Sequence, residues 1–528
     1  METRLIGLKS ILSLLAAHFI IIPAHATSPP LRCADLVVAA DRAREEITDQ
    51  AGKYVVHVDG ATVSDVGSLQ AQINADGIEA AIIVGGDFQG WDFTNMSLAP
   101  ACFVDSNLSN SIWFKASLQG AAFVRTNLEG SNFRASDIAH VYFDNSNLKG
   151  LDARGANLSW GRFGGGWFEG SIEGWNIDDA NMTGFTFECG ITLSDGCPLY
   201  QGGAEMSAKG TEFSGATLHS FGLYNVDLTG AILNQTIIGP RQFPHLINAD
   251  FRGDIILRGG DSDVRLTSEE ALRLLTENAK QKSVEAQPAF DCTKAASKVE
   301  QEICGEYSHD LRAMDRKMSS LYKKAKAFDP AIKASQRAWL KQRNGCGGSE
   351  YPADCLRETY GKRIGALLVV LGPTEWLARG EAALFTDDLL SLPESFTGTD
   401  LYSKIAPSLV GASMAEILVE RGEDGLYAIK GSAVGANAHL CSLYAWHLYF
   451  DRKTGWYIPV SEEAALPIFR IFGNRLEIFA NGRPDYKKYP DASKFMSCGM
   501  RASFSEVLRV ETRDAVIERY RKSLNEEM

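Results

Sequence analysis

The sequence lacks the short motifs of several common enzyme classes. It contains no GxSxG, no HExxH and no Walker loop. No CxxC occurs among its ten cysteines, and its nine histidines show no spacing that would make a zinc site. We therefore expect a protein that is not an enzyme, with no catalytic residues, no cofactor and no metal ion.

Two short matches to elements of penicillin-binding proteins are weaker than they look. They are SLYK, which runs from Ser320 to Lys323, and KTG, which runs from Lys453 to Gly455. A catalytic SxxK serine should begin a helix that faces a cleft, whereas Ser320 falls in mid-helix beside core positions. We interpret both matches as chance.

Long apolar runs are also scarce, and the one near the start has the form of an export signal. Arg4 and Lys9 precede ILSLLAAHFIII, and the AHA at 24–26 offers a small-residue cleavage site. The alternative is a membrane anchor, but Pro23 follows too soon for a full span. Removing residues 1–26 takes away one acid and two bases, which changes the formal charge from −13 to −14. We expect a soluble, periplasmic mature protein without a transmembrane segment.

Charge is distributed unevenly along the chain. Residues 91–172 contain seven acids and six bases, whereas residues 288–370 contain ten acids and fifteen bases. The acidic remainder would steer a basic partner toward the molecule. The positive segment could instead bind anionic polymers of the cell wall or envelope.

A five-residue period dominates the first half of the sequence. From Phe93 to Phe168 every fifth residue is large and apolar except Ala153, and the residue two places before it is nearly always small. A helix has a period of 3.6 and a strand a period of 2, so neither accounts for this spacing. The pattern predicts repeating units that bury one face by stacking on their neighbours.

The repeated units SNLSN, TNLEG and SNLKG resemble the pentapeptide-repeat family over about residues 83–258. The resemblance implies a right-handed, four-sided β-helix with one pentapeptide per side and twenty residues per coil. Some members of that family are acidic mimics of DNA that bind DNA gyrase. The near-neutral repeat and the expected export argue against this role, so we expect no nucleic-acid partner.

The expected solenoid spans residues 81–260, with an inserted loop at 173–207. Residues 27–80 would cap its first end. Its second end would be capped by a helix within 261–287, because Thr267 and Glu270 form a capping-box pair before a helical stripe.

Helical periodicity replaces the five-residue period after Phe290. Apolar residues at Leu311, Met314, Met318 and Leu321 share one helix face. Asp329 and Pro330 are expected to be the N-cap and first turn of the next helix. The segment 288–371 is thus a small helical unit that needs its four cysteines for stability.

This segment closely resembles the LprI-like lysozyme-inhibitor family over about residues 288–371. The matching positions are Phe290, Asp291, Cys292, Ala295, Glu300, Ile303, Cys304, Met314, Asp315, Gln336, Arg337, Trp339, Arg343, Cys346, Cys355, Tyr360 and Arg363. The resemblance implies a periplasmic or cell-surface protein that can block lysozyme. Candidates for the binding surface are Gln336, Arg337, Trp339 and Arg343. The alternatives are helix-packing core for Trp339 and intrahelical salt bridges for the two arginines.

The ten cysteines fall into near-neighbour pairs, which favours disulfides in an oxidising compartment. Connectivity does not follow from sequence. The pairings suggested by position are Cys292 with Cys304, Cys346 with Cys355, Cys189 with Cys197, Cys441 with Cys498, and Cys33 with Cys102.

The last segment, residues 372–528, has the alternation and turn signals of strands, as in GWYIPV and RLEIFA. The expected fold class is therefore multidomain and mainly β: a quadrilateral β-helix, a small disulfide-bonded α-helical domain, and a β-rich (α+β) C-terminal domain. His439 and His447 could share a strand face, but the sequence offers them no acidic or cysteine ligand at suitable spacing.

The sequence thus predicts a secreted binding protein that acts without catalysis. The first hypothesis is a lysozyme inhibitor or related envelope-protection protein. The alternative is a periplasmic scaffold that binds envelope proteins or cell-wall polysaccharide through the solenoid flank and basic helices.

Overall fold

A computed structural model describes residues 55–73, 80–98, 101–165, 172–189, 205–219, 221–223, 225–260, 262–372, 377–434, 440–460, 466–479, 495–499, 504 and 507–510. The expected signal peptide at 1–26, together with Cys33, Cys197 and His439, lies outside these residues.

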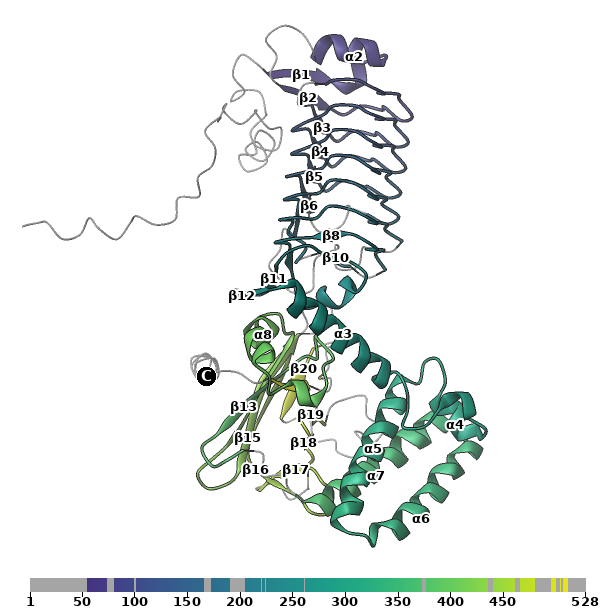
Figure 1. The fold of residues 1–528 in the computed structure, drawn as a ribbon, viewed down its shortest axis with the longest axis vertical. Coiled ribbons are helices and arrows are strands. Elements are labelled where there is room, and N and C mark those ends of the chain that lie inside the picture. Colours follow the sequence, from purple (N-terminus) through teal and green to yellow (C-terminus); the bar gives the residue numbers. More distant parts are fainter. Residues whose placement is uncertain are drawn as a thin grey trace, which may run out of the picture.

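A solenoid of stacked coils forms the N-terminal half of the molecule (Figure 1). One of its sides is a seven-stranded parallel sheet whose strands follow chain order. These strands are β1 (Val55–Asp59), β2 (Ala80–Val84), β3 (Ala101–Val104), β4 (Ala122–Val124), β5 (Tyr142–Asp144), β6 (Arg162–Gly165) and β7 (Thr186–Cys189). A short helix η1 (Gly60–Thr62) and helix α2 (Val66–Ile73) connect β1 to β2 at the end of the stack.

The coils have four sides of five residues each. Phe103 pairs with Phe123, and Phe123 with Phe143, so the register advances by twenty residues per coil. The other three sides are marked by parallel bridges such as Asp87 with Asn107, Asp92 with Ile112, and Ser97 with Ser117. The mainly β fold class and the pentapeptide solenoid are thereby confirmed.

The period of five follows from what each position of a side must do. The large residues fill the interior, where the rings of Phe103 and Phe123 stack with centroids 5.6 Å apart. The small residues close the corner; the Ser131 hydroxyl donates to the carbonyl of Leu108 at 2.7 Å. Two residues after each large one the backbone takes a positive φ, as at Gly130, which favours Gly and Asn there.

The expected loop at 173–207 is wrong in its first part, because residues 172–189 form a coil. Ile172, Ile177 and Met182 are buried and keep the period of five. Register jumps by 24 residues from Asp152 to Asn176 and by 31 from Asn176 to Ser207, instead of twenty. The insertions therefore flank this coil, and the first of them shifts its phase relative to the preceding run.

Short elements end the solenoid on its other side. They are β8 (Ile232–Leu233), β9 (Ile237–Ile238), η3 (Phe243–Leu246), β10 (Asp250–Phe251), β11 (Ile255–Gly259) and β12 (Ser262–Leu266). Helix α3 (Ser268–Glu285) follows, and its N-terminal capping box of Thr267 and Glu270 is confirmed.

The end of the solenoid is also covered by α8 (Asp400–Gly411), which comes from much later in the chain (Figure 1). The Ser408 hydroxyl donates to the carbonyl oxygens of Leu257 and Ser262, at 3.1 and 3.2 Å. Lys404 lies 2.7 Å from the Glu270 carboxylate of the capping box. Apolar residues of α8 belong to the same hydrophobic cluster as the solenoid interior, so the two parts share one core.

The helical segment comprises η4 (Cys292–Lys294), α4 (Lys298–Ile303), α5 (His309–Phe328), α6 (Ile332–Gly345), η5 (Cys346–Gly348) and α7 (Pro352–Leu371). Helix α6 begins later than expected. Asp329 is the C-cap of α5, and its carboxylate accepts a hydrogen bond from the backbone of Ala331, which is the N-cap of α6.

The C-terminal segment is a closed antiparallel sheet. Its elements are β13 (Ala382–Thr386), η6 (Glu394–Phe396), α8, β14 (Ala415–Arg421), β15 (Tyr427–Val434), β16 (Leu440–Phe450), β17 (Tyr457–Pro459), β18 (Phe469–Phe472), β19 (Arg475–Ile478), β20 (Met496–Cys498) and β21 (Val507–Val510). The strand order is β15-β14-β13-β21-β19-β18-β17-β16-β20, and β15 also pairs with β16, which closes the ring. Among the helices that the structure describes, none is long and apolar enough to cross a membrane.

Candidate functional site

Two disulfides fasten the helical segment. Cys292 is bonded to Cys304, which joins η4 to the end of α4. Cys346 is bonded to Cys355, which joins η5 to the first turn of α7. Elsewhere Cys441 is bonded to Cys498, across strands β16 and β20, and Cys102 is also disulfide-bonded.

Helices α5 and α7 run side by side in the same direction. Asp310 near the start of α5 forms an ion pair with Arg357 near the start of α7, at 2.6 Å. One turn or so further along each helix, the Tyr360 hydroxyl donates to Asp315 at 2.7 Å. The N-terminal ends of both helices therefore lie at one end of the segment, together with the disulfide Cys346–Cys355.

A buried polar network holds the helices in register. The carboxylate of Asp315, which is 2% exposed, accepts hydrogen bonds from the Tyr360 hydroxyl and from the backbone of Ala289, at 2.7 and 2.8 Å. Arg343 donates to the Tyr360 oxygen at 3.4 Å. Burial, aided by the nearby Asp315 charge, raises the pKa of Tyr360 far above its usual range, so the hydroxyl remains a donor.

Two further residues of the family motif belong to this interior. Gln336 accepts a hydrogen bond from the guanidinium of Arg363 at 2.8 Å and donates to the sulfur of Met318. The Trp339 indole donates to the carbonyl of Thr359 at 3.1 Å. Both side chains are about nine-tenths or more buried, so they position helices.

The four residues expected at a binding surface thus separate into two groups. Gln336, Trp339 and Arg343 lie in the interior. This corrects the surface place suggested for Gln336 and Arg343, and for Trp339 it agrees with the alternative of helix-packing core. The reason is helix geometry, because positions i, i+3 and i+7 share the face of α6 that packs on α5 and α7. Only Arg337 is exposed.

Arg337 belongs to a basic stripe on the outer face of α6. Lys333, Arg337 and Lys341 are spaced by four residues, are exposed, and form no ion pair with any other residue that the structure describes. Helix α6 lies at the outer edge of the molecule (Figure 1), so this stripe is open to large partners.

The end of the segment that carries the N-termini of α5 and α7 has a different character. Tyr307, just before α5, is 87% exposed, and Tyr351, the N-cap of α7, is 65% exposed. The neighbouring Glu306 and Glu350 are exposed as well. We call these four residues the tyrosine tip; it combines aromatic contact area with negative charge.

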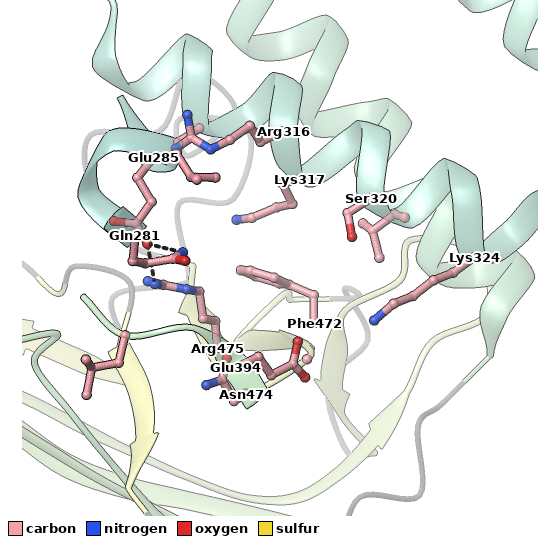
Figure 2. A pocket seen from close by; sticks show the side chains of 15 residues that line it. Gln281, Glu285, Arg316, Lys317, Ser320, Lys324, Glu394, Phe472, Asn474 and Arg475 are labelled. Carbon is pink, nitrogen blue, oxygen red and sulfur yellow. Dashed lines mark hydrogen bonds and ion pairs between the residues drawn. The ribbon is translucent and has the colours of Figure 1, made fainter. Parts of the chain in front are cut away.

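A cavity of about 460 Å³ separates the helical segment from the closed sheet. Its walls are the last turn of α3, one face of α5, Glu394 of η6 and the β18–β19 hairpin (Figure 2). Ser320 lines it, but Lys323 of the SLYK match does not. In the described part of the chain the Ser320 hydroxyl has no hydrogen-bond partner, and no group of three His, Cys, Asp or Glu could hold a metal ion.

Sequence reasoning did not find this cavity. Its residues come from four segments that lie far apart in the sequence, and the contacting residues Glu285 and Arg475 are 190 positions apart. The available signal was weak: Arg316, Lys317, Ser320 and Lys324 recur at helical spacing and mark a polar face on α5.

Comparisons with known proteins bear on two segments. The family described as pentapeptide repeats matches in 8 copies over residues 101–138, 114–150 and 131–166. The family described as lysozyme inhibitor LprI matches residues 292–367. No curated protein matches the chain.

Several solved structures are similar to part of the chain. A trypsin-treated form of QnrB1, a plasmid-mediated fluoroquinolone resistance protein, is 15% identical with a TM-score of 0.21, over 43% of this chain and 98% of that one. HetL, a pentapeptide repeat protein of the cyanobacterium Nostoc sp. strain PCC 7120, is 15% identical with a TM-score of 0.14, over 36% and 91%. A pentapeptide repeat protein of the Arabidopsis thaliana thylakoid lumen is 18% identical with a TM-score of 0.08, over 24% and 68%.

The five-residue period, the four-sided coils, the disulfide-fastened helices and the two family matches agree. The chain joins a solenoid of pentapeptide repeats to a helical segment that matches the family described as lysozyme inhibitor LprI.

Proposed function

We propose that the chain is an exported, non-catalytic binding protein whose helical domain binds a lysozyme and blocks it. The match of residues 292–367 to the lysozyme inhibitor LprI family carries this proposal. We assign residues 1–26 to a signal peptide, 288–371 to the inhibitory domain and 372–528 to a C-terminal domain. The disulfides of the helical domain support an oxidising location such as the periplasm.

The tyrosine tip is the surface that suits a basic enzyme best. Exposed tyrosines supply large contact area, and interface hot spots are rich in them. Glu306 and Glu350 beside them provide charge opposite to that of a basic partner, which speeds and orients association. The basic stripe of α6 would repel the same partner.

Inhibition of peptidoglycan lysis by lysozyme tests the proposal. The oxidised, mature chain should inhibit saturably, and Tyr307→Ala or Tyr351→Ala should each weaken inhibition by roughly tenfold, as expected for a hot-spot contact. Arg337→Ala, on the basic stripe, is the matched control and should inhibit like the parent. No inhibition by the parent at large molar excess sinks the proposal for the lysozyme used.

A second function, a scaffold for anionic envelope polymers, is favoured by the unpaired basic stripe Lys333, Arg337 and Lys341. Sedimentation with insoluble peptidoglycan measures it directly. Binding that falls steeply with added salt and is lost in Arg337→Glu supports the scaffold. Binding that is unchanged by added salt and by Arg337→Glu contradicts the scaffold function.

A further inference from the structure

The outer face of the closed sheet carries aromatic side chains that the proposed inhibition does not use. Along β16 the buried residues Leu443 and Ala445 alternate with Tyr444 and Trp446, which are 46% and 50% exposed. The two exposed rings lie against each other, with their centroids 4.7 Å apart. Apolar side chains that gather on an exposed face, rather than being scattered singly, mark an interaction surface.

A β-bulge brings a further side chain of β16 to this face. The register of β15 and β16 leaves Ala428 alone opposite two residues, Trp446 and His447. His447 has a φ of 54°, in the left-handed region, and its side chain is exposed as well. Bulges turn side chains to new directions and are common beside functional sites.

Trp446 and His447 line a second cavity, of about 430 Å³, beside the β14–β15 hairpin. Glu423 and Asp424, which are both exposed, belong to the same lining. Within the described part of the chain neither carboxylate forms an ion pair, and Asp424 accepts one hydrogen bond, from the backbone of Leu426 at 2.9 Å. The second cavity therefore places an aromatic surface beside carboxylate oxygens that can accept further hydrogen bonds.

The charge of the second cavity disfavours an anionic ligand. Its lining carries three carboxylates, those of Glu420, Glu423 and Asp424, against the single guanidinium of Arg421. That guanidinium donates to the backbone carbonyl of Leu377 at 2.9 Å. The ligand should therefore be uncharged or positive, unlike the anionic polymers that the basic stripe would bind.

Hydroxyl groups extend the face beyond the two rings. Ser442 of β16 pairs with Ser432 of β15 on one side and with Ser497 of β20 on the other, and all three are exposed. Tyr444 is the next outward-facing residue of β16, because side chains alternate along a strand. His447 apart, β16 and β20 contain no ionisable residue that is charged at neutral pH. Away from the second cavity the face is therefore uncharged.

A sugar chain has the chemistry that this surface matches. The C–H groups of a sugar ring carry a small positive charge and pack on the negative face of an aromatic ring. Sugar hydroxyls donate to carboxylate and serine oxygens, and hydrogen bonds to an ionised acceptor are the stronger ones. A basic peptide would also pair with the carboxylates, but β16 and β20 offer it no acidic residue.

We propose that the outer face of β16 and the second cavity bind an uncharged sugar chain. A sugar ring stacks on Trp446 and Tyr444, and its hydroxyls donate to Glu423 and Asp424. Bound to the glycan of a cell wall, the protein would lie beside the polymer that a lysozyme cleaves. That consequence rests on the proposed inhibition, whereas the sugar site does not.

Calorimetric titration of the full oxidised chain with three sugar oligomers and one peptide tests the proposal. Chitohexaose is a chain of N-acetylglucosamine, cellohexaose and maltohexaose are chains of glucose that differ in linkage, and trilysine is the cationic alternative. At least one sugar oligomer should bind saturably and with little dependence on salt, because the ligand is uncharged. The tightest oligomer identifies the class of sugar. Binding of trilysine alone, or of none of the four, overturns the proposal.

Substitutions locate the binding. Trp446→Ala should weaken binding of the tightest oligomer by about tenfold, and Trp446→Phe, which keeps a ring, should weaken it less. Glu423→Gln should weaken it by about threefold, because a neutral amide accepts weaker hydrogen bonds than a carboxylate. Trp160→Ala, at a solenoid side chain that is 58% exposed, is the matched control and should bind like the parent.

All four variants should keep the circular dichroism spectrum of the parent, since the altered side chains are half-exposed or exposed. Equal binding by the parent and Trp446→Ala, or equal weakening by Trp160→Ala, overturns the site. Lysozyme inhibition is measured in a separate assay, so either proposal can fail without the other.

Discussion

Tyr360, a residue of the LprI-like motif, stabilises the helical domain by a hydrogen bond to the buried carboxylate of Asp315. Its hydroxyl is one of two donors to Asp315, and the other is the backbone of Ala289 at the entrance to the domain. A buried carboxylate that loses a donor keeps its desolvation cost without compensation. The residue therefore connects α5, α7 and the chain leading from α3.

Tyr360→Phe removes only this hydroxyl and should destabilise the helical domain by about 1–3 kcal/mol. Urea unfolding followed by circular dichroism measures the change. Tyr351→Phe, at an exposed tyrosine of the same domain, is the control and should unfold like the parent. Equal midpoints for all three proteins would contradict the role of the network.

Gly259 is required where the solenoid meets α8. A Cβ built on it would lie 1.7 Å from the carbonyl oxygen of Ser408, which no side chain can tolerate without movement of the helix. Gly259→Ala should therefore cost roughly 1–3 kcal/mol or more through overpacking. Gly398→Ala, where a Cβ meets no atom within 4 Å, is the control. The thermal unfolding midpoints of the two variants, each compared with that of the parent, test this prediction.

At the level of single residues, the sequence predicts burial correctly where a short repeat period determines which side chains face the interior. The buried column from Phe93 onward follows from the period of five alone. The family resemblance alone suggests Gln336, Trp339 and Arg343 as candidates for a binding surface, with helix-packing core as the alternative for Trp339. Their helical spacing places them on one face and Arg337 off it, and that spacing was the available signal.

At the level of elements, the solenoid tolerates insertions because each coil contacts only its neighbours. The register jumps of 24 and 31 residues leave the bridges from Asn157 to Asn181 and from Asn181 to Glu212 intact. The first insertion changes the phase of the period of five, so the intervening coil does not continue the phase of the run that begins at Phe93. The capping box of Thr267 and Glu270 was predictable because it is local; its ion pair with Lys404, 134 residues later, was not.

The C-terminal end of the solenoid should weaken in mild acid. Burial is the main cause that lowers the pKa of His219 and of His245 below the usual 6.5, aided by Arg258 for the first and Lys282 for the second. Asp263 opposes the shift at His219. The unfolded chain then binds protons first, so stability is fully present above about pH 6.5 and is lost as pH falls through the lower folded pKa values.

Urea unfolding of the parent and of a His219→Gln/His245→Gln double variant at pH 7.5 and pH 5 tests this coupling. The parent should lose more stability between the two pH values than the variant does. An equal loss in both proteins would assign the acid sensitivity to other groups.

At the level of the whole molecule, the sequence does not predict which distant strands pair or which elements share a core. Strand β13 pairs with β21, so Leu384 lies opposite Val510, and this pairing joins the two ends of the segment within one sheet. Period and composition identify strands but carry no information about partners so far apart. The sharing of one core by the solenoid and α8 was hidden for the same reason.

The distribution of cores predicts three unfolding units. The solenoid interior continues into α8 as one hydrophobic cluster, the closed sheet has a second, and the helical domain has a third together with two disulfides of its own. Removing Cys292–Cys304 by a Cys292→Ser/Cys304→Ser double variant should cost that domain roughly 2–4 kcal/mol, since the unfolded loop is no longer constrained. Differential scanning calorimetry should then show one transition shifted to lower temperature and the solenoid transition unmoved.

Cys441→Ser/Cys498→Ser, in the closed sheet, is the control and should leave the transition of the helical domain in place. If the first variant moves every transition together, the molecule unfolds as a single unit, and the ion pairs of Lys317 and Arg475 across the cavity couple its domains more strongly than their separate cores suggest.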